Sequence, residues 1–165
     1  MVSCVFPGSF DPVTKGHMDL IQRAASLFDR VTVTVMINIS KKGTLSLEDR
    51  IRLLENACSD FPNVRVDSWD GLLADYMKKK KERIVIRGVR NTPEFEHELS
   101  SACANKMLNG SVETFFIPTD PALAGVSSSA VREIFSFGGD ISSFVPEKLI
   151  KEIGELLSKN QYSNK

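Results

Sequence analysis

The order of apolar and polar positions along the chain predicts strands that alternate with helices. Five short runs rich in apolar and β-branched residues are typical of buried strands, at residues 2–6, 31–37, 64–68, 84–86 and 113–117. Between these runs, apolar side chains recur at helical spacing in four segments: 17–28, a segment from the capping pattern at Ser46 onward, 71–80 and 93–108. The pattern therefore predicts a repeated strand–helix unit.

This alternation predicts an α/β fold with a doubly wound, mostly parallel five-stranded sheet, because a helical crossover returns the chain to a parallel strand. A helical stretch from Ser129 to Phe137 and a helix at about 146–157 follow the last strand, so two C-terminal helices are expected. We expect residues 1–165 to form one domain, with 159–165 as a frayed tail. Ligands of such sheets bind beyond the carboxyl ends of the strands.

The amino-acid composition argues against nucleic-acid, membrane and metal partners. The 21 basic and 21 acidic residues cancel, so the positive footprint of a nucleic-acid binder is missing. Apolar runs stay well short of the roughly 18 residues of a membrane span, so no membrane partner is expected and the cytoplasm is the default location. The three cysteines, Cys4, Cys58 and Cys103, are far apart, so neither a disulfide framework nor a metal site is expected.

The segment Pro7–His17 joins the first strand to the first helix and carries the clearest chemical signal. Its glycines allow the backbone to turn and to approach a ligand closely. A helix N-terminus presents unpaired N–H groups that suit a phosphate, and His17 in the first helical turn can reach the same anion. The spacing matches neither the P-loop pattern nor the dinucleotide-binding glycine pattern.

Two further segments suit anions at the same edge of the sheet. Val126–Arg132 places three serines at the start of a helix, where they can cradle phosphate, although a serine there can equally be a simple helix cap. Ile86–Asn91 places Arg87 and Arg90 around a glycine after the fourth strand, and an arginine fork suits phosphate. Lys41 follows the second strand, where a merely solvated role stays open.

The motifs in these segments resemble those of a known superfamily. Residues 8–17 fit G-[ST]-F-D-P-x-x-x-G-H, and residues 126–132 resemble I-S-S-[ST]-x-x-[RK], the two signatures of the nucleotidyltransferases. The T-x-G-H form at Thr14, the R-G-V-R stretch and the segments 95–98 and 105–108 resemble the phosphopantetheine adenylyltransferases. This resemblance implies a Rossmann-like nucleotidyltransferase fold and transfer of AMP from ATP to 4′-phosphopantetheine, with dephospho-coenzyme A and pyrophosphate as products.

The resemblance also implies roles for individual residues. ATP would be bound by Gly8, Ser9, Phe10, His17, Gly88, Val89, Arg90, Glu98, Val126, Ser127, Ser128 and Ser129. The acceptor would be bound by Ser9, Lys41, Leu73 and Arg87, although a core leucine at position 73 would look identical. Catalysis would rest on His17, Lys41 and Arg90. The resemblance further implies Mg²⁺ carried in with ATP, a homohexamer and coenzyme A as a feedback ligand.

Two alternative functions remain open at this point. One is another member of the superfamily, such as a nicotinate-mononucleotide adenylyltransferase or a cytidylyltransferase that acts on a phosphorylated alcohol. Thr14 and the R-G-V-R stretch argue against it. The other is a nucleotide-binding module without activity, since a fold does not fix a function. Such a module would bind ATP but release no pyrophosphate.

Overall fold

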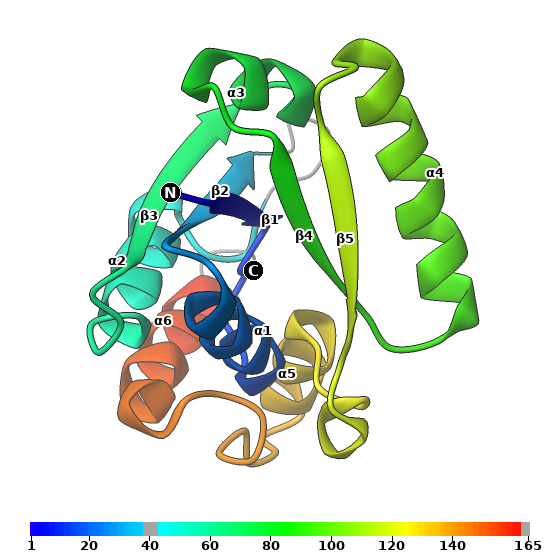
Figure 1. Ribbon diagram of the computed structural model, residues 1–165. Helices are drawn as coiled ribbons and strands as arrows, with labels where there is room; N and C mark the ends of the chain where they lie inside the picture. The colour runs from blue at the N-terminus through cyan, green and yellow to red at the C-terminus, as the bar shows by residue number, and fades with distance from the viewer. Residues whose placement is uncertain (38–42, 163–165) are drawn as a thin grey trace.

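The computed structural model describes residues 1–37 and 43–162, and it contains one five-stranded sheet. All strand pairs are parallel and the strand order is β3-β2-β1-β4-β5 (Figure 1). The strands are β1 (Ser3–Gly8), β2 (Arg30–Ile37), β3 (Val64–Asp70), β4 (Ile84–Val89) and β5 (Glu113–Pro118). The α/β fold predicted from the alternating pattern is confirmed.

Helices connect consecutive strands and complete the C-terminal part of the chain (Figure 1). They are α1 (Lys15–Leu27), α2 (Leu47–Ala57), α3 (Leu73–Lys80), α4 (Thr92–Leu108), α5 (Ser128–Ser136) and α6 (Ile150–Tyr162), with short 3₁₀ turns η1 (Pro121–Leu123) and η2 (Glu147–Leu149). None of the helices within the described ranges has the length and apolar character of a membrane span.

Alternate side chains of β1 show how the two faces of the sheet are covered. Cys4 and Phe6 belong to the larger core cluster, which is completed by helices α1, α2, α5 and α6. Val5 points to the opposite face, where it packs with Tyr76 and Met77 of α3. Right-handed crossovers explain this division, because the chain moves outward from β1 to β3 and then returns to β4 and β5 on the other side.

Several elements extend beyond the runs that predicted them. β1 continues through Pro7 to Gly8 by pairing with β2, and β4 continues through Arg87 to Val89 by pairing with β5. Helix α6 runs to Tyr162, past the predicted end at Leu157. Apolar runs mark where side chains are buried, whereas backbone pairing continues into residues whose side chains face the site.

The strand order places a crevice at the carboxyl end of the central strand. β1 lies between β2 and β4, and the direction of winding reverses between these two neighbours. In open parallel sheets this reversal separates the loops on either side and leaves room for a ligand. The ends of β1 and β4, with Gly8 and Arg87, border this crevice.

Candidate active site

A cavity of about 620 Å³ occupies the crevice, a volume within the usual range of ligand pockets. Its walls come from the ends of β1, β2 and β4, the loop after β1, residues 43–44, the starts of α1, α2 and α5, and the first turns of α4. Most predicted site residues line it: Gly8, Ser9, Phe10, His17, Arg87, Gly88, Arg90, Glu98, Val126, Ser127, Ser128 and Ser129. The fold therefore brings together residues of three segments, 8–17, 87–98 and 126–129, whose outermost members are 121 positions apart in the sequence.

Two predicted residues, Val89 and Leu73, lie outside the cavity lining, and a third, Lys41, is not described. Val89 ends β4 and is not part of the cavity lining. Leu73 begins α3 and packs against the smaller core cluster around Tyr76 and Met77, outside that lining. Lys41 lies outside the described residues. The ligand roles of these three residues stay predictions.

His17 is held by the cap of its own helix. The Thr14 side chain accepts a hydrogen bond from the His17 backbone N–H at 3.3 Å, and His17 Nδ1 lies 3.0 Å from the Thr14 backbone N–H. A backbone N–H can only donate, so Nδ1 must accept and carries no proton. The neutral ring therefore carries its proton on Nε2, as a hydrogen-bond donor.

The surroundings of His17 favour this neutral form. Its ring lies 4.9 Å from the ring of Phe10 and 6.4 Å from that of Phe6. Burial, followed by the positive charges of Arg87 and Arg90, lowers the pKa of His17 from 6.5 to about 4. At neutral pH the side chain is thus an uncharged donor among cationic neighbours.

The conformation of the loop after β1 is fixed by the buried ring of Phe10 and by hydrogen bonds to Asp11. Phe10 is completely buried beneath the cavity, and its backbone has a φ of 47°, a conformation that a bulky residue adopts only when the surroundings impose it. A Cβ on Gly8 would lie 2.9 Å from the Phe10 ring, so the loop has no space for a larger residue there. The Asp11 carboxylate accepts bonds from the backbone N–H groups of Thr44 and Leu45, each at 2.8 Å.

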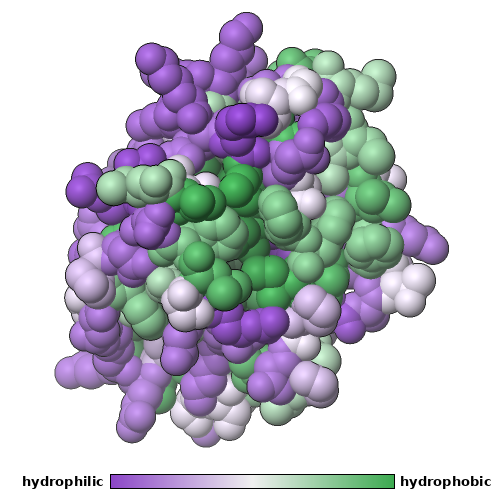
Figure 2. All heavy atoms as spheres, viewed as in Figure 1, coloured by the Kyte–Doolittle hydropathy of each residue, from purple (hydrophilic) through white to green (hydrophobic). Residues whose placement is uncertain are grey.

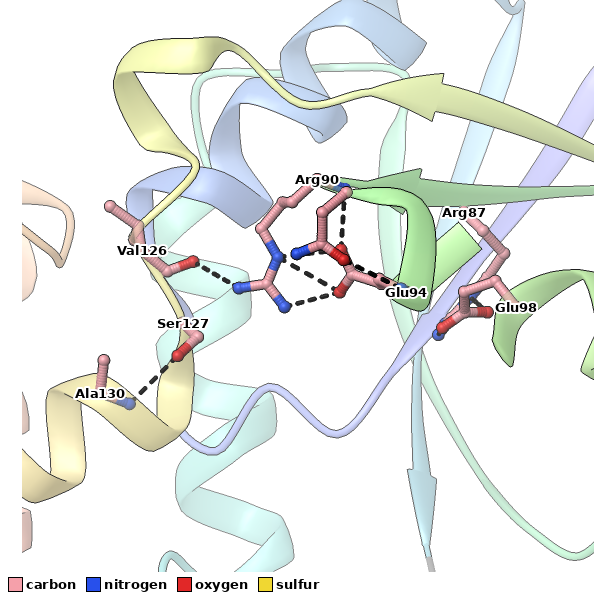
Figure 3. A network of polar contacts seen from close by, with 8 residues as sticks. Arg87, Arg90, Glu94, Glu98, Val126, Ser127 and Ala130 are labelled. Atoms are coloured by element: carbon pink, nitrogen blue, oxygen red, sulfur yellow. Dashed lines mark hydrogen bonds and ion pairs between the residues drawn. The ribbon is translucent and has the colours of Figure 1, made fainter. Parts of the chain in front are cut away.

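Arg90 lies between two walls of the cavity, as Figure 3 shows. Its Nε and Nη2 donate to the Glu94 carboxylate at 2.6–3.2 Å, and its Nη1 donates to the Val126 carbonyl at 3.2 Å. Hydrogen bonding from Arg90 lowers the pKa of Glu94. Three of the five N–H groups of the guanidinium are engaged in these contacts, which leaves one on each terminal nitrogen for a ligand.

Arg87 of β4 has a similar arrangement, and its acid, Glu98, lies one helical turn after Glu94 on α4 (Figure 3). Its Nε donates to Glu98 at 2.7 Å, its Nη2 pairs with the other oxygen of that carboxylate, and its Nη1 donates to the Pro7 carbonyl. Glu98, predicted to contact ATP, thus holds the residue predicted to contact the acceptor. Both arginines are oriented by acids on the same helix.

The start of α5 forms the remaining wall. Ser127 caps the helix by accepting from the Ala130 N–H at 3.1 Å, and Ser128 donates to the Pro12 carbonyl at 2.7 Å. Two of the three serine hydroxyls therefore fix the helix start beside the loop after β1, and Ser127 acts as the helix cap, whereas its contact with phosphate stays a prediction. The unpaired N–H groups of this helix end remain suited to a phosphate.

Four charged residues that line the cavity were not predicted as site residues: Asp11, Arg50, Glu94 and Arg132. Arg132 donates to the Asp11 carbonyl and to Ser129, and it stands in the same motif as the serines, which is the signal that could have indicated it. Glu94 follows Arg90 at the i,i+4 spacing of helical ion pairs. Asp11 and Arg50 act through contacts distant in sequence.

Acidic groups in the cavity are already engaged. Asp11 binds two backbone N–H groups, and Glu94 and Glu98 each bind an arginine. Among the residues that the structure describes, no three His, Cys, Asp or Glu side chains gather where they could hold a metal ion.

Comparison with known proteins agrees with this geometry. The model of the family described as cytidylyltransferase-like matches residues 5–134. A crystal structure from Vibrio parahaemolyticus, described as a candidate nicotinate-nucleotide adenylyltransferase, superposes with a TM-score of 0.64 and covers 96% of this chain and 93% of its own. Its sequence identity is 18%, so it supports the fold alone.

Curated relatives are much more similar in sequence. A phosphopantetheine adenylyltransferase from Clostridium perfringens is 47% identical over 154 residues, which are 93% of this chain and 94% of the relative. Proteins of the same name from Dictyoglomus thermophilum and Clostridium novyi are 47% and 44% identical, and each alignment covers 94% of this chain and at least 94% of the relative. The chain therefore belongs to the cytidylyltransferase-like family and, within it, to the phosphopantetheine adenylyltransferases.

Proposed function

We propose that this chain performs its family's reaction, the transfer of AMP from ATP to the phosphate of 4′-phosphopantetheine, through the residues that line the cavity. One observation carries the residue assignment. The neutral His17 donor, two oriented arginines and the N-terminus of α5 converge on a single cavity at the carboxyl ends of β1 and β4. Such a set of donors suits a chain of phosphates.

The reaction requires no general base. The second pKa of a phosphomonoester is about 6, so the acceptor phosphate is already largely a dianion at neutral pH. One of its oxygens attacks the α-phosphorus of ATP, the bond from that phosphorus to the bridging oxygen breaks, and pyrophosphate leaves with the bonding electrons. The protein has to align the two phosphates and to stabilise the charge that moves between them.

His17 is assigned to the α-phosphate. The Nε2–H of a neutral imidazole can donate to an oxygen that gains charge as the phosphorus becomes five-coordinate. Because Thr14 fixes the tautomer through Nδ1, no proton transfer is needed to present this donor.

The charged residues fall into two groups, one for the leaving pyrophosphate and one for the acceptor phosphate. Arg90, the serines and the helix end of α5 would hold the β- and γ-phosphates, which become the leaving group. Arg87 and Ser9, with Lys41 from the segment outside the described residues, would hold the acceptor phosphate. Mg²⁺ would arrive with ATP, held mainly by phosphate oxygens and water, because the carboxylates that line the cavity already accept bonds from the protein.

We also propose a homohexamer, supported by an apolar surface on α3, α4 and β5. Figure 2 shows hydrophobic residues that extend from the centre of this face toward α4. The exposed members include Leu72, Phe95, Leu99, Met107, Leu108 and Phe115. Such a continuous apolar surface is typical of an interface between subunits. Coenzyme A, which contains the adenylated pantetheine of the product, is expected to compete at the same cavity.

A pyrophosphate-release assay tests the proposed reaction. Purified protein with ATP and Mg²⁺ is offered four acceptors separately: 4′-phosphopantetheine, pantetheine, nicotinate mononucleotide and glycerol 3-phosphate. We expect release with phosphopantetheine alone, because Arg87 would have no anion to meet in pantetheine. Comparable turnover of pantetheine, or preference for either of the other phosphates, would contradict the proposal.

A further inference from the structure

Arg50 is a buried charged residue that the reaction scheme above does not use. It lies in the first turns of α2, is only 8% exposed, and its side chain lines the cavity. Moving a guanidinium out of water is costly unless an opposite charge compensates for it. Its position therefore calls for a charged partner.

The protein supplies only neutral partners for Arg50 among the described residues. Its Nη1 donates to the Ser9 carbonyl at 3.1 Å and its Nε approaches the Ser46 carbonyl at 3.4 Å, whereas no carboxylate there lies within ion-pair distance. The other arginines of the cavity differ in this respect. Arg87 pairs with Glu98, Arg90 with Glu94, and Arg132 lies 3.9 Å from Asp11.

The unpaired charge lies at a defined place in the cavity. A Cβ built on Gly43 would be 3.5 Å from Arg50 Nη2 and 3.6 Å from its Cζ, so the guanidinium rests against the backbone that follows β2. Its other neighbour is the Ser9 backbone, in the loop that follows β1. Arg50 thus lies between the backbone at Gly43 and that at Ser9, whereas Arg90 contacts Glu94 of α4 and Val126, just before α5.

We infer that Arg50 is a positioning residue of the acceptor-phosphate site, which compensates the negative charge of that phosphate and holds the Ser9 backbone beside it. The inference rests on the proposed function, since it assigns the loop at Ser9 to the acceptor. Of the five N–H groups of Arg50, two point to carbonyls and three remain for an anion or for water. The acceptor's phosphate would supply the negative charge that Arg50 lacks among the described residues.

Two substitutions separate the charge of Arg50 from its hydrogen bonds. Arg50→Gln retains an N–H donor at about the position of Nε, toward the Ser46 carbonyl, but removes the charge, and Arg50→Lys retains the charge without the planar fork. Arg52→Gln is the matched control, because Arg52 lies on the same helix, is 54% exposed and pairs with Asp49 and Glu152 away from the cavity. Thermal unfolding of each variant verifies that it folds.

Calorimetry then measures binding of 4′-phosphopantetheine, pantetheine and ATP to each protein, and steady-state assays give KM for both substrates. We expect Arg50→Gln to weaken phosphopantetheine binding about ten-fold or more, as expected for loss of a charged partner, and ATP binding by less than about three-fold. Arg50→Lys should lie between this variant and the parent. Pantetheine binding should be unchanged in every variant, and Arg52→Gln should match the parent.

The result that overturns the inference is an equal loss of affinity for phosphopantetheine, pantetheine and ATP, or no loss at all, in a folded Arg50→Gln protein. Equal losses would identify Arg50 as a general support of the cavity wall. If Arg50→Gln does not fold, Arg50→Lys becomes the test. Phosphopantetheine affinity that is unaltered in Arg50→Lys would support the requirement for charge. An equal loss of affinity for all three ligands would oppose it. Failure of the proposed function itself would be distinct, because the parent protein would then not turn over phosphopantetheine.

Discussion

Acidification should reveal the neutral state of His17. A pKa of about 4 leaves about 3% of His17 protonated at pH 5.5, whereas an unperturbed imidazole of pKa 6.5 would be about 90% protonated there. The geometry supports the low value, because a proton on Nδ1 would face the Thr14 N–H and replace a hydrogen bond with two opposed donors.

The same shift sets the sign of the effect on stability. The unfolded chain takes up the proton near pH 6.5 and the folded chain only near pH 4, so the unfolded state binds more protons between these values. The free energy of unfolding therefore rises with pH through this window. The gain from His17 is on the order of 3 kcal/mol, at about 1.4 kcal/mol for each pKa unit.

The assay is a titration by NMR without nucleotide. The chain has two histidines, so His97→Gln leaves one imidazole whose C2–H shift can be followed directly. We expect a midpoint near 4 and, at pH 7, nitrogen shifts of a ring protonated at Nε2. Arg90→Gln should raise the midpoint, since Arg90 contributes to the shift, and Arg52→Gln should not.

A midpoint close to 6.5, or a proton on Nδ1 at neutral pH, would refute this account of His17. In the first case about a quarter of the rings would be charged at pH 7, and in the second case the nitrogen that faces the α-phosphate would carry no proton. A normal midpoint that Arg90→Gln leaves unchanged would further show that the ring does not experience the positive charge of the cavity.

Two other substitutions test the proposed roles. His17→Ala should lower the rate of single-turnover pyrophosphate release about 100- to 1000-fold, because the donor acts mainly on charge formed in the transition state. ATP affinity, measured by calorimetry, should stay within a few fold of the parent. Equal losses of rate and affinity would contradict this role. Glu94→Gln should raise KM for ATP several-fold, because the Arg90 guanidinium would lose the carboxylate that orients it. Glu96→Gln, at an exposed position on the same helix, should leave KM unchanged. An unchanged KM in Glu94→Gln would show that Arg90 needs no such support.

Much of the fold could be predicted because each strand contains a local run of apolar and β-branched residues. The β-branched run at 31–37 corresponds to β2 with a difference of one residue, and the alternation with helices determines the parallel sheet. Strand ends were less predictable. Arg87 belongs to β4 through backbone pairing with Phe116, and such pairing leaves no trace in the hydrophobic pattern.

The cavity residues that belong to sequence motifs could be predicted, and the others could not. The segments at Ser9, Arg87 and Ser127 lie at or after the carboxyl ends of strands, so parallel topology alone brings them together. Arg50 and Asp11 could not be found in this way. Each acts through a contact more than 30 residues away, and an arginine on a polar helix is ordinarily a surface residue.

Helix α4 lacks any buried residue, yet it carries both acids that orient the arginines of the cavity. Its apolar residues Phe95 and Leu99 stand beside Glu94 and Glu98 along the same 17-residue rod. A tilt of this helix would move both of its flanks together, so a subunit that docked on the apolar flank would also shift the acids that orient the arginines. By thermodynamic reciprocity, nucleotide in the cavity would then alter the strength of that docking, and ATP affinity would vary with protein concentration.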